Sequence, residues 1–433
     1  MKIDNKLYLD NCKIYFKDKY DSFINELSNE STKGFFVNSL KGNVNDILNM
    51  IDFDYSKSIL NKNSYYHHNE HISSSKAYEL GLIYPQGIES SFSSTLLDLN
   101  NINLIVDMCA APGGKSINYI NKYKDALLIS NDANYKRALL INNNFERLGI
   151  DNAIVTSIDT FTLSNRLNNC ADLVILDAPC SGEGMARKTL DIFDTYSDKY
   201  IDSLANLQKE LLEDAYNLLN GDSYLIYSTC AYSFKEDEAN IKYFLDLHKD
   251  VELINIECDN NSSILSGTVK LSFLNNTEGQ FIAILHKKGT KNKINCKYLK
   301  SIKNKVVDKF IKDNLNIKEY YLYQEDNRFY MSFKSLLDLK TNILREGIYL
   351  GDIANNRFVP NHFMYRANSL IGLYKYEYEL DDKQYEDFIK GLEIKIDNLT
   401  NNYYHLTYKK YSLGFGKYSN GVIKNKYPKG LRK

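Results

Sequence analysis

The chain has 433 residues, 43% of them hydrophobic, and a formal net charge of -1 at pH 7. This length predicts about three domains, and the near-neutral charge excludes a globally basic or acidic protein, so any basic surface has to be local. Met1–Tyr20 carries charges throughout and lacks the apolar centre of a signal peptide. No apolar run approaches the roughly 18 residues of a membrane helix. We therefore expect a cytoplasmic protein with no membrane partner, whose seven cysteines are reduced thiols.

Residues 1–95 mix helix and strand patterns and are predicted to form an accessory α/β domain that contacts RNA. Phe35–Lys41 has the pattern of a strand and turn, and an amphipathic helix is expected near Val44–Ile51. Gly81–Ser91 contains the glycine and proline residues that are typical of a loop, and it leads into a helix. We expect this loop to close over a cofactor or a base.

Three histidines in the same region raise the question of a metal site. His67 and His71 have the spacing that places two side chains on one helix face, and His68 lies between them. No cysteine or second pair accompanies them. We therefore favour a polar loop and predict no metal.

Residues 96–290 alternate strands with helices, which is typical of a parallel sheet covered by helices on both faces. The expected strands are Leu104–Val106, Ala126–Asp132, Ala153–Ser157, Asp172–Leu176 and Tyr224–Tyr227. The expected helices are Tyr135–Leu148, Tyr200–Leu219 and Lys235–Leu247. Thr268–Leu274 and Gln280–His286 are predicted to pair as antiparallel strands at the end of this domain.

The stretch LIVDMCAAPGGKS at Leu104–Ser116 has the pattern of a buried strand followed by a turn into a helix. Small residues and Pro112-Gly113-Gly114 let a ligand approach backbone N–H groups there. A P-loop is excluded, because Cys109 occupies the position of its first glycine. The three-glycine dinucleotide fingerprint is also absent. An ordinary tight turn remains the alternative to a turn of the S-adenosylmethionine type.

Polar residues follow each of the predicted strands. Because open α/β sheets bind ligands at the carboxyl ends of their strands, these side chains should converge. They are Asp107, Asp132, Asp159, Asp177, Cys180 and Cys230. Asp132 is suited to a ribose hydroxyl pair. A lone buried cysteine is usually inert packing, but two cysteines beside motif turns at adjacent strand ends favour a reactive site.

A lysine-rich linker is predicted from 291 to about 310, followed by small domains at about 300–365 and 366–433. The last 17 residues contain no acidic side chain and six basic ones: Lys417, Lys424, Lys426, Lys429, Arg432 and Lys433. Tyr418 and Tyr427 alternate with them. Basic charge with aromatic rings suits an RNA backbone and exposed bases, and the glycines and Tyr427-Pro428 favour an ordered element over a frayed tail.

Three central motifs, DMCAAPGGKS, DAPCSGEGMARK and YSTCAYSFKEDEAN, give the chain a specific family resemblance. The sequence resembles the RNA cytosine-5 methyltransferases of the Nol–Nop–Sun type, and within them the bacterial RsmF-like 16S ribosomal RNA enzymes. The ending KNKYPKGLR and the stretch GIYLGDIANNRFVPNH resemble the RsmF-like C-terminal region. This resemblance implies a Rossmann-like class I methyltransferase domain and a PUA-like last domain.

The resemblance also implies roles for individual residues. Cys230 would be the nucleophile, and Cys180 would help to release the product. The residues implied to bind S-adenosylmethionine are Cys109, Ala110, Ala111, Pro112, Gly113, Gly114, Lys115, Asp132, Asp159 and Asp177. The sequence departs from the family pattern at Ala186, usually Phe, and at Glu278–Phe281, commonly EGFF.

The chemistry expected from these residues is addition of a thiolate to C6 of cytosine, which makes C5 able to accept a methyl group. Asp177 can hold or protonate the N3 edge, and Lys115 and Lys188 are candidate phosphate or base contacts. The expected partner is ribosomal RNA or the small ribosomal subunit, bound by a monomer.

Several alternatives stay open from sequence alone. Cys180 could be the nucleophile, because Pro-Cys after the fourth strand has that role in DNA cytosine methyltransferases. The substrate could be transfer RNA. The chain could also be a catalytically idle RNA binder in ribosome assembly, although both cysteines and all four carboxylates are present. A nucleoside-triphosphate hydrolase is disfavoured by the missing P-loop glycine.

Overall fold

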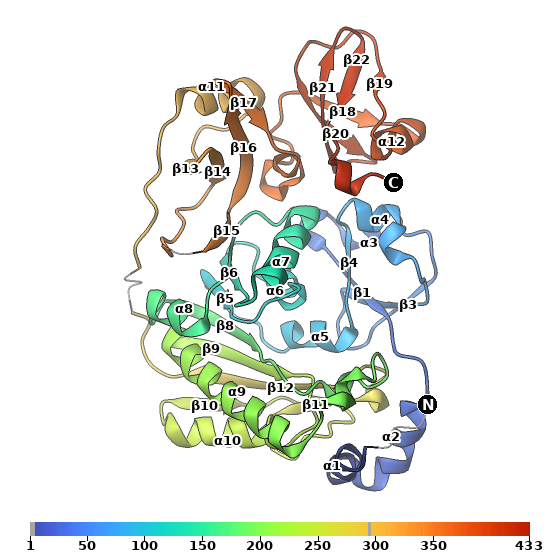
Figure 1. The fold of residues 1–433 in the computed structure, drawn as a ribbon, viewed down its shortest axis with the longest axis vertical. Coiled ribbons are helices and arrows are strands. Elements are labelled where there is room, and N and C mark those ends of the chain that lie inside the picture. The colour runs from blue at the N-terminus through green and yellow to red at the C-terminus, as the bar shows by residue number, and fades with distance from the viewer. Residues whose placement is uncertain (1–4, 293–295, 341) are drawn as a thin grey trace.

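The computed structural model describes residues 5–292, 296–340 and 342–433. Its strands form four sheets, of which the central one has nine strands. Figure 1 shows this central sheet with the N-terminal unit on one side and two C-terminal β units above it. In the described ranges no helix is long and apolar enough to cross a membrane.

The N-terminal region divides into a helical hairpin and a small sheet. Helices α1 (Lys6–Phe16) and α2 (Tyr20–Leu27) pack on the central domain, where the rings of Phe23 and Phe273 stack with centroids 5.0 Å apart. The antiparallel sheet has the order β2-β3-β1-β4, from Tyr55–Lys57, Ser64–His67, Gly34–Val37 and Ile83–Pro85. Helices α3 (Val44–Leu48), α4 (Lys76–Glu79) and α5 (Ile88–Phe92) accompany it.

Two sequence predictions for this region need correction. Tyr65–His67 belongs to strand β3 rather than to a polar loop, because it pairs between β1 and β2 and His67 is buried. The segment expected to be a loop at Gly81–Ser91 contains strand β4 before helix α5. The strand near Phe35 and the helix from Val44 are confirmed. No cluster of metal ligands occurs within the described ranges.

The central sheet has the order β10-β12-β9-β8-β5-β6-β7-β15, with β11 paired to β12. Its strands are β5 (Leu104–Asp107), β6 (Leu127–Asn131), β7 (Ala153–Thr156), β8 (Ala171–Asp177), β9 (Leu219–Thr229), β10 (Val251–Ile254), β11 (Val269–Leu271), β12 (Gln280–Lys287) and β15 (Ile343–Glu346). The helices between them are α6 (Gly114–Lys122), α7 (Tyr135–Leu148), α8 (Thr160–Arg166), α9 (Asp198–Leu218) and α10 (Glu238–Leu247). The strands from β5 to β9 are parallel, and β12 runs antiparallel to β9.

The central strands are buried on both faces, so apolar side chains cover the sheet above and below. The chain starts this sheet in the middle, at β5, and moves outward first to β7 and later to β8 and β9. The strand order therefore reverses between β5 and β8, which is where a doubly wound sheet leaves a crevice for ligands. The predicted α/β Rossmann-like fold is confirmed.

Most predicted elements of this domain agree with the structure to within a few residues, and the antiparallel pair β11 and β12 is confirmed. Strand β9 was expected to be shorter, because Asn220-Gly221 resembles a helix stop, but both residues lie within it. Helix α10 begins at Glu238 rather than Lys235. The sheet also gains an edge strand, β15 (Ile343–Glu346), which pairs with β7 from far along the chain.

The C-terminal half contains two small β units. Helix α11 (Lys305–Asn314) precedes a sheet of the order β13-β14-β16-β17, from Tyr321–Glu325, Arg328–Ser332, Ile348–Ala354 and Arg357–Pro360. The last sheet has the order β18-β20-β21-β22-β19, from Glu377–Leu380, Tyr403–Tyr408, Tyr411–Ser419, Val422–Asn425 and Ile394–Lys395, with helix α12 (Asp382–Ile389). The C-terminal basic segment is therefore ordered, as predicted.

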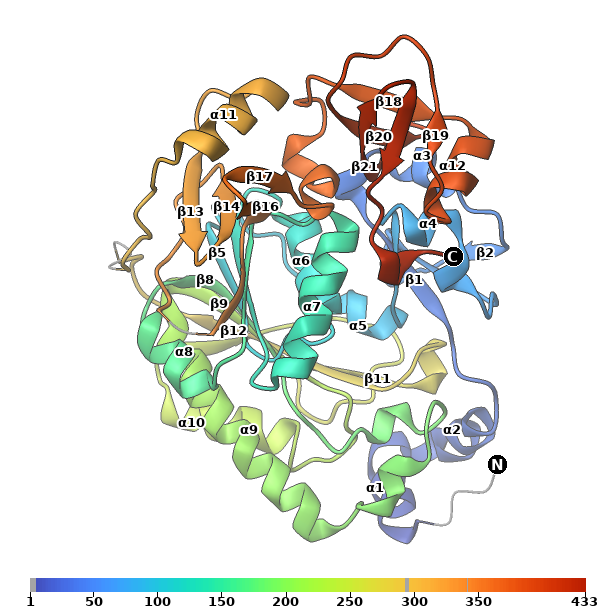
Figure 2. The same ribbon diagram turned by 45° about the horizontal axis from the view of Figure 1, so that its top comes forward.

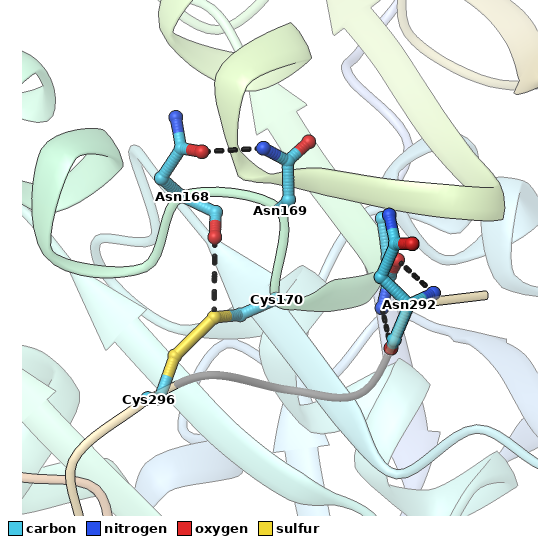
Figure 3. Close-up of a disulfide and its surroundings, with 6 residues drawn as sticks. Asn168, Asn169, Cys170, Asn292 and Cys296 are labelled. Atoms are coloured by element: carbon cyan, nitrogen blue, oxygen red, sulfur yellow. Dashed lines mark hydrogen bonds between the residues drawn. A yellow bond between two sulfur atoms is a disulfide. The ribbon is translucent and has the colours of Figure 1, made fainter.

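The linker is tied to the central domain by a disulfide between Cys170 and Cys296, shown in Figure 3. The prediction that all seven cysteines are free thiols is wrong for this pair; Cys12, Cys109, Cys180, Cys230 and Cys258 are free. Close to it, Asn220 exchanges two hydrogen bonds with the backbone of Asn292. Residues 293–295 of the predicted linker lie outside the described residues.

The carboxyl end of α7 is the place where three units of the protein meet (Figure 2). Asn38 of the N-terminal unit donates to the carbonyl oxygen of Leu148 at 2.9 Å. Arg366 of the C-terminal half donates to the carbonyl oxygens of Arg147 and Glu79 at 2.9 and 2.6 Å. Lys41 in turn donates to the carbonyl of Arg366 at 3.0 Å. We call Asn38, Lys41, Arg147 and Arg366 the α7 junction.

Candidate active site

A cavity of about 220 Å³ opens at the carboxyl ends of β5 and β8. Its wall comes from the turn after β5, the segment joining β4 to α5, and the loop after β8. Larger hollows occur elsewhere, one of them of about 800 Å³ between α7 and β13–β16, but none of the predicted catalytic or cofactor-binding residues lines it. The crevice predicted from strand order therefore coincides with the turn after β5 and with Asp177, whereas Cys180 and Cys230 lie outside its wall.

The turn after β5 approaches its neighbours closely through small residues. Ala110 donates its N–H to the carbonyl of Asn131 at 2.8 Å, so the turn is fixed against the end of β6. Gly113 caps α6 with a φ of 107°, in the left-handed region that favours glycine. A side chain at Gly114 would meet the amide of Gln86 at 2.7 Å. This turn is therefore shaped to expose backbone to the cavity.

Asp107 lies at the bottom of the turn. One carboxylate oxygen accepts from Ser116 Oγ at 2.7 Å, while Oδ1 is buried without a hydrogen-bond partner. Complete burial raises the pKa of Asp107 to about 7. An unpartnered buried acceptor is costly, so this position suits a ligand that brings a donor or a positive charge.

Asp132 and Asp159 lie farther along the same edge of the sheet, outside the wall of the cavity. Asp132 is buried and accepts from the N–H of Asn134 at 3.0 Å, with Arg137 at 3.3 Å. Asp159 caps helix α8 by accepting from Thr162, and these hydrogen bonds lower the pKa of its carboxyl. Both carboxylates stand where sequence placed them, at the ends of β6 and β7.

Lys115 and Asp177 form an ion pair across the cavity, with Nζ and Oδ2 2.9 Å apart. The lysine side chain is 5% exposed and that of Asp177 is 39% exposed. Ser228 donates to the other carboxylate oxygen of Asp177 at 2.7 Å. The pair therefore presents a fixed positive and negative charge to anything that enters.

Cys180 and Cys230 lie side by side after the neighbouring strands β8 and β9, with their sulfur atoms 3.1 Å apart. The N–H of Cys230 also donates to Cys180 Sγ at 3.3 Å. The contact with Cys230 and burial raise the pKa of the Cys180 thiol well above its ordinary value. Either sulfur can donate the proton in the S–H···S contact.

The turn that carries Cys230 is held from several sides. Gly184 donates its N–H to the carbonyl of Cys230 at 2.7 Å. Thr229 donates to Asp237 at 2.5 Å, and Asp237 is paired with the buried ammonium of Lys270 at 2.8 Å. Neither Asp237 nor Lys270 was predicted as a site residue. The acidic run after Cys230 was a visible signal for the first, whereas nothing local marks Lys270.

Lys188 and Glu89 meet at the mouth of the cavity, with Nζ and Oε1 3.6 Å apart. Lys188 was predicted as an RNA contact and its side chain is 30% exposed. Glu89 was not predicted. It belongs to the α5 segment, which was expected to close over the site and does contribute to its wall.

The C-terminal basic residues lie on a different part of the molecule from the cavity. Lys417 and Lys424 are partners in neighbouring strands, and Lys426 and Lys429 are exposed after them. Arg432 is exposed and donates to a backbone carbonyl. The expectation that the tyrosines among them stack on bases is wrong for Tyr418 and Tyr427, because both rings are buried in the core.

Comparison with known proteins agrees with this geometry. Residues 94–286 match the family model of 16S rRNA methyltransferase RsmB/F, and residues 375–433 match that of the methyltransferase RsmF PUA domain. Residues 94–286 are therefore a methyltransferase domain of the RsmB/F type. The RsmF PUA match covers the last sheet. The RsmB/F match runs along the central sheet from β5 into β12 and does not include the edge strand β15.

Similar proteins match this chain over different shares of its length. Ribosomal RNA small subunit methyltransferase F from Shewanella loihica is 26% identical over 72% of this chain and 67% of its own length. The 25S rRNA (cytosine-C(5))-methyltransferase nop2 from Schizosaccharomyces pombe is 37% identical over 35% of this chain, which spans only 26% of that protein. The crystal structure of a methyltransferase homologue from Pyrococcus horikoshii is 27% identical, with a TM-score of 0.57, and covers 65% of this chain and 95% of its own.

Proposed function

We propose that this protein is an S-adenosylmethionine-dependent methyltransferase that modifies C5 of cytosine in ribosomal RNA, with 16S ribosomal RNA as its substrate. The observation that carries the proposal is the pair Cys180 and Cys230, 3.1 Å apart beside the Lys115–Asp177 ion pair. One thiol can attack a base while the other holds a proton, and the ion pair can hold the ring. This arrangement is also what distinguishes the chain from an idle RNA binder.

The cofactor fits the turn after β5. The unpartnered oxygen of Asp107 is suited to the ammonium group of S-adenosylmethionine, and the small residues from Cys109 to Gly114 leave room beside exposed backbone. We assign Asp132 to the ribose hydroxyls and Asp159 to the outer part of the same ligand. When bound, the cofactor supplies an electrophilic methyl group.

The chain's own residues carry the remaining chemistry. Cys230 adds to C6 of the cytosine, and the ring becomes nucleophilic at C5. The ammonium of Lys115 stabilises the negative charge that develops on the N3 and O2 edge, and Asp177, held by Ser228, protonates N3. After methylation, removal of the C5 proton lets the C6–sulfur bond break and restores the ring. We assign that step to Cys180, which lies beside Cys230.

The target base has to leave its stack to reach the cavity, which costs least in unpaired RNA. We assign the exposed C-terminal cations to the RNA backbone, and Lys188 to the RNA close to the target. In this proposal the protein acts as a monomer in the cytoplasm, on ribosomal RNA alone or within the small subunit.

The proposal is tested by incubating the purified protein and labelled cofactor with 16S ribosomal RNA, small subunits and transfer RNA, and then locating 5-methylcytosine by bisulfite sequencing. The expected result is 5-methylcytosine in 16S RNA, in one or both of its forms, and none in transfer RNA. Label in transfer RNA alone would reassign the substrate. Absence of label from every RNA, with RNA binding retained, would establish the idle binder instead.

A further inference from the structure

Three carboxylates line the cavity: Asp107, Asp177 and Glu89. The proposed mechanism gives roles to Asp107 and Asp177 and none to Glu89. Glu89 is 3% exposed, although it lies in a short helix that forms the wall of an open site. A carboxylate kept so far from water needs partners for its oxygens. The hydrogen bonds of the three groups show which of them has acceptor capacity left for a substrate.

Both oxygens of Asp177 are engaged, one by Ser228 at 2.7 Å and the other by Lys115 at 2.9 Å, and the proposed mechanism uses this carboxyl at N3. Asp107 has a free oxygen, but it lies at the bottom of the cofactor turn, hydrogen-bonded to Ser116 at the start of α6. Asp177 is thus assigned to N3 and Asp107 to the cofactor, so neither is left for the exocyclic amine of the base.

Glu89 differs from both of them. Its Oε2 accepts only a long contact from the N–H of Glu278 at 3.4 Å, and its Oε1 is 3.6 Å from Lys188 Nζ. The contact with Glu278 also connects Glu89 to the turn that carries the nucleophile, since Gly279 donates to the carbonyl of Gly184 at 2.8 Å and Gly184 donates to the carbonyl of Cys230 at 2.7 Å. Glu89 is thus the lining carboxylate with the most open acceptor positions.

Its neighbour Gly87 makes this placement possible. A Cβ built on Gly87 would lie 1.8 Å from Oε1 of Glu89, so the carboxylate occupies the space that a side chain would fill. Gly87 has a φ of -62°, which any residue can adopt. The glycine is therefore needed for space rather than for backbone conformation, and a methyl group there would push the carboxylate aside without distorting the chain.

Cytosine and uracil differ at C4, where cytosine carries an amino donor and uracil a carbonyl acceptor. A carboxylate that can only accept hydrogen bonds favours the first and repels the second. We propose that Glu89 is a specificity-determining residue that accepts a hydrogen bond from the exocyclic amine of the target cytosine, with Lys188 holding its carboxylate. This assignment rests on the proposed methyltransferase function and adds the group that selects the base.

The test compares formation of a covalent protein–RNA adduct on two otherwise identical RNAs, one with 5-fluorocytosine and one with 5-fluorouracil at the target. The fluorine replaces the C5 proton, so once Cys230 has added and the methyl group has been transferred, the C6–sulfur bond cannot be released and the adduct persists. The rate of its formation with the cofactor present reports base selection directly. Cofactor affinity and melting temperature are measured on every variant.

We expect the wild type to prefer the 5-fluorocytosine RNA by at least about 100-fold. In Glu89→Gln the amide can either donate or accept, so this preference should fall at least tenfold while cofactor affinity and melting temperature stay unchanged. Gly87→Ala should reproduce the effect with Glu89 still present. Glu210→Gln, an exposed residue of α9, is the matched control and should leave the preference unchanged.

Full retention of the preference by Glu89→Gln would overturn the assignment. So would a uniform loss on both RNAs accompanied by a lower melting temperature, since that would mean that Glu89 only supports helix α5. A wild-type protein that forms an adduct with neither RNA would refute the proposed function, and this assignment with it, and is readily distinguished from both outcomes.

Discussion

The catalytic edge of the central sheet and the α7 junction are both built from buried polar residues, yet they have different origins. At the catalytic edge the functional groups stand at strand ends, since Asp107 and Asp177 end β5 and β8 and Cys230 directly follows β9. At the junction, Lys41 and Arg366 come from opposite ends of the chain and satisfy backbone carbonyls around α7. The first region serves chemistry, and the second fixes the units around it.

This difference predicts that substitutions in the two regions fail in different ways. Removing a group at the catalytic edge should lower activity with little effect on stability, because those groups line the cavity or lie in the loops beside it. Removing a group at the junction should lower stability with little effect on cofactor binding, because it leaves buried carbonyl oxygens without donors.

The largest effect is expected from Lys115→Met. Loss of the buried ammonium leaves Asp177 without its partner and removes the positive charge offered to the ring, so kcat should fall about 100-fold or more, equivalent to about 2.7 kcal/mol. Steady-state kinetics with ribosomal RNA measures this. The melting temperature should change by no more than a few degrees, and a variant that loses activity only because it unfolds would contradict the distinction between the two regions.

Arg366→Met tests the junction. The guanidinium donates to the carbonyl oxygens of Glu79 and Arg147, and its loss should cost about 1–3 kcal/mol of unfolding free energy. Denaturant unfolding measures the loss, and calorimetry on the folded variant should give wild-type cofactor affinity. An equal loss of cofactor affinity would show that the junction and the catalytic edge are coupled rather than separate.

The exposed C-terminal lysines form a third region. Substitutions there should change neither kcat nor the free energy of unfolding. Exchange of Lys424, Lys426 and Lys429 for methionine should weaken RNA binding and reduce the slope of its logarithmic salt dependence by about 2, at about 0.7 per contact with single-stranded RNA. Filter binding at several salt concentrations reads this slope. If it is unchanged, the segment does not contact the RNA backbone.

The smallest effect is expected in the pH dependence of stability. Burial raises the pKa of Asp107 and of Glu183 to about 7, whereas carboxyls of the unfolded chain titrate near about 4. Between about pH 4 and pH 7 the folded state therefore binds more protons than the unfolded state. The stability that this proton binding provides is lost as the pH rises through about 7. Melting temperatures should fall from pH 6 to pH 8, and the Asp107→Asn, Glu183→Gln double variant should flatten that fall. A steeper fall in the double variant would contradict these assignments.

Sequence predicted the catalytic edge because its information is local. Strand, turn and helix follow each other within a few residues, so the positions of Cys180 and Cys230 could be inferred from their strands. Partners distant in the chain left no such signal: β15 joins β7 from nearly 200 residues away, and Cys170 pairs with Cys296 across 126 residues. Glu89 was not predicted for another reason. What marks it is that a buried carboxylate keeps open acceptor positions, and this is visible only in the three-dimensional structure.

Substitutions of Cys180 and Cys230 provide the most direct test of the proposed mechanism. The RNA and cofactor are incubated with Cys230→Ala and with Cys180→Ala, and each mixture is separated on a denaturing gel that detects protein joined to labelled RNA. If Cys230 attacks and Cys180 completes release, Cys230→Ala gives neither product nor adduct, whereas Cys180→Ala accumulates adduct. An adduct from Cys230→Ala and none from Cys180→Ala would contradict the account and reverse the roles of the two thiols.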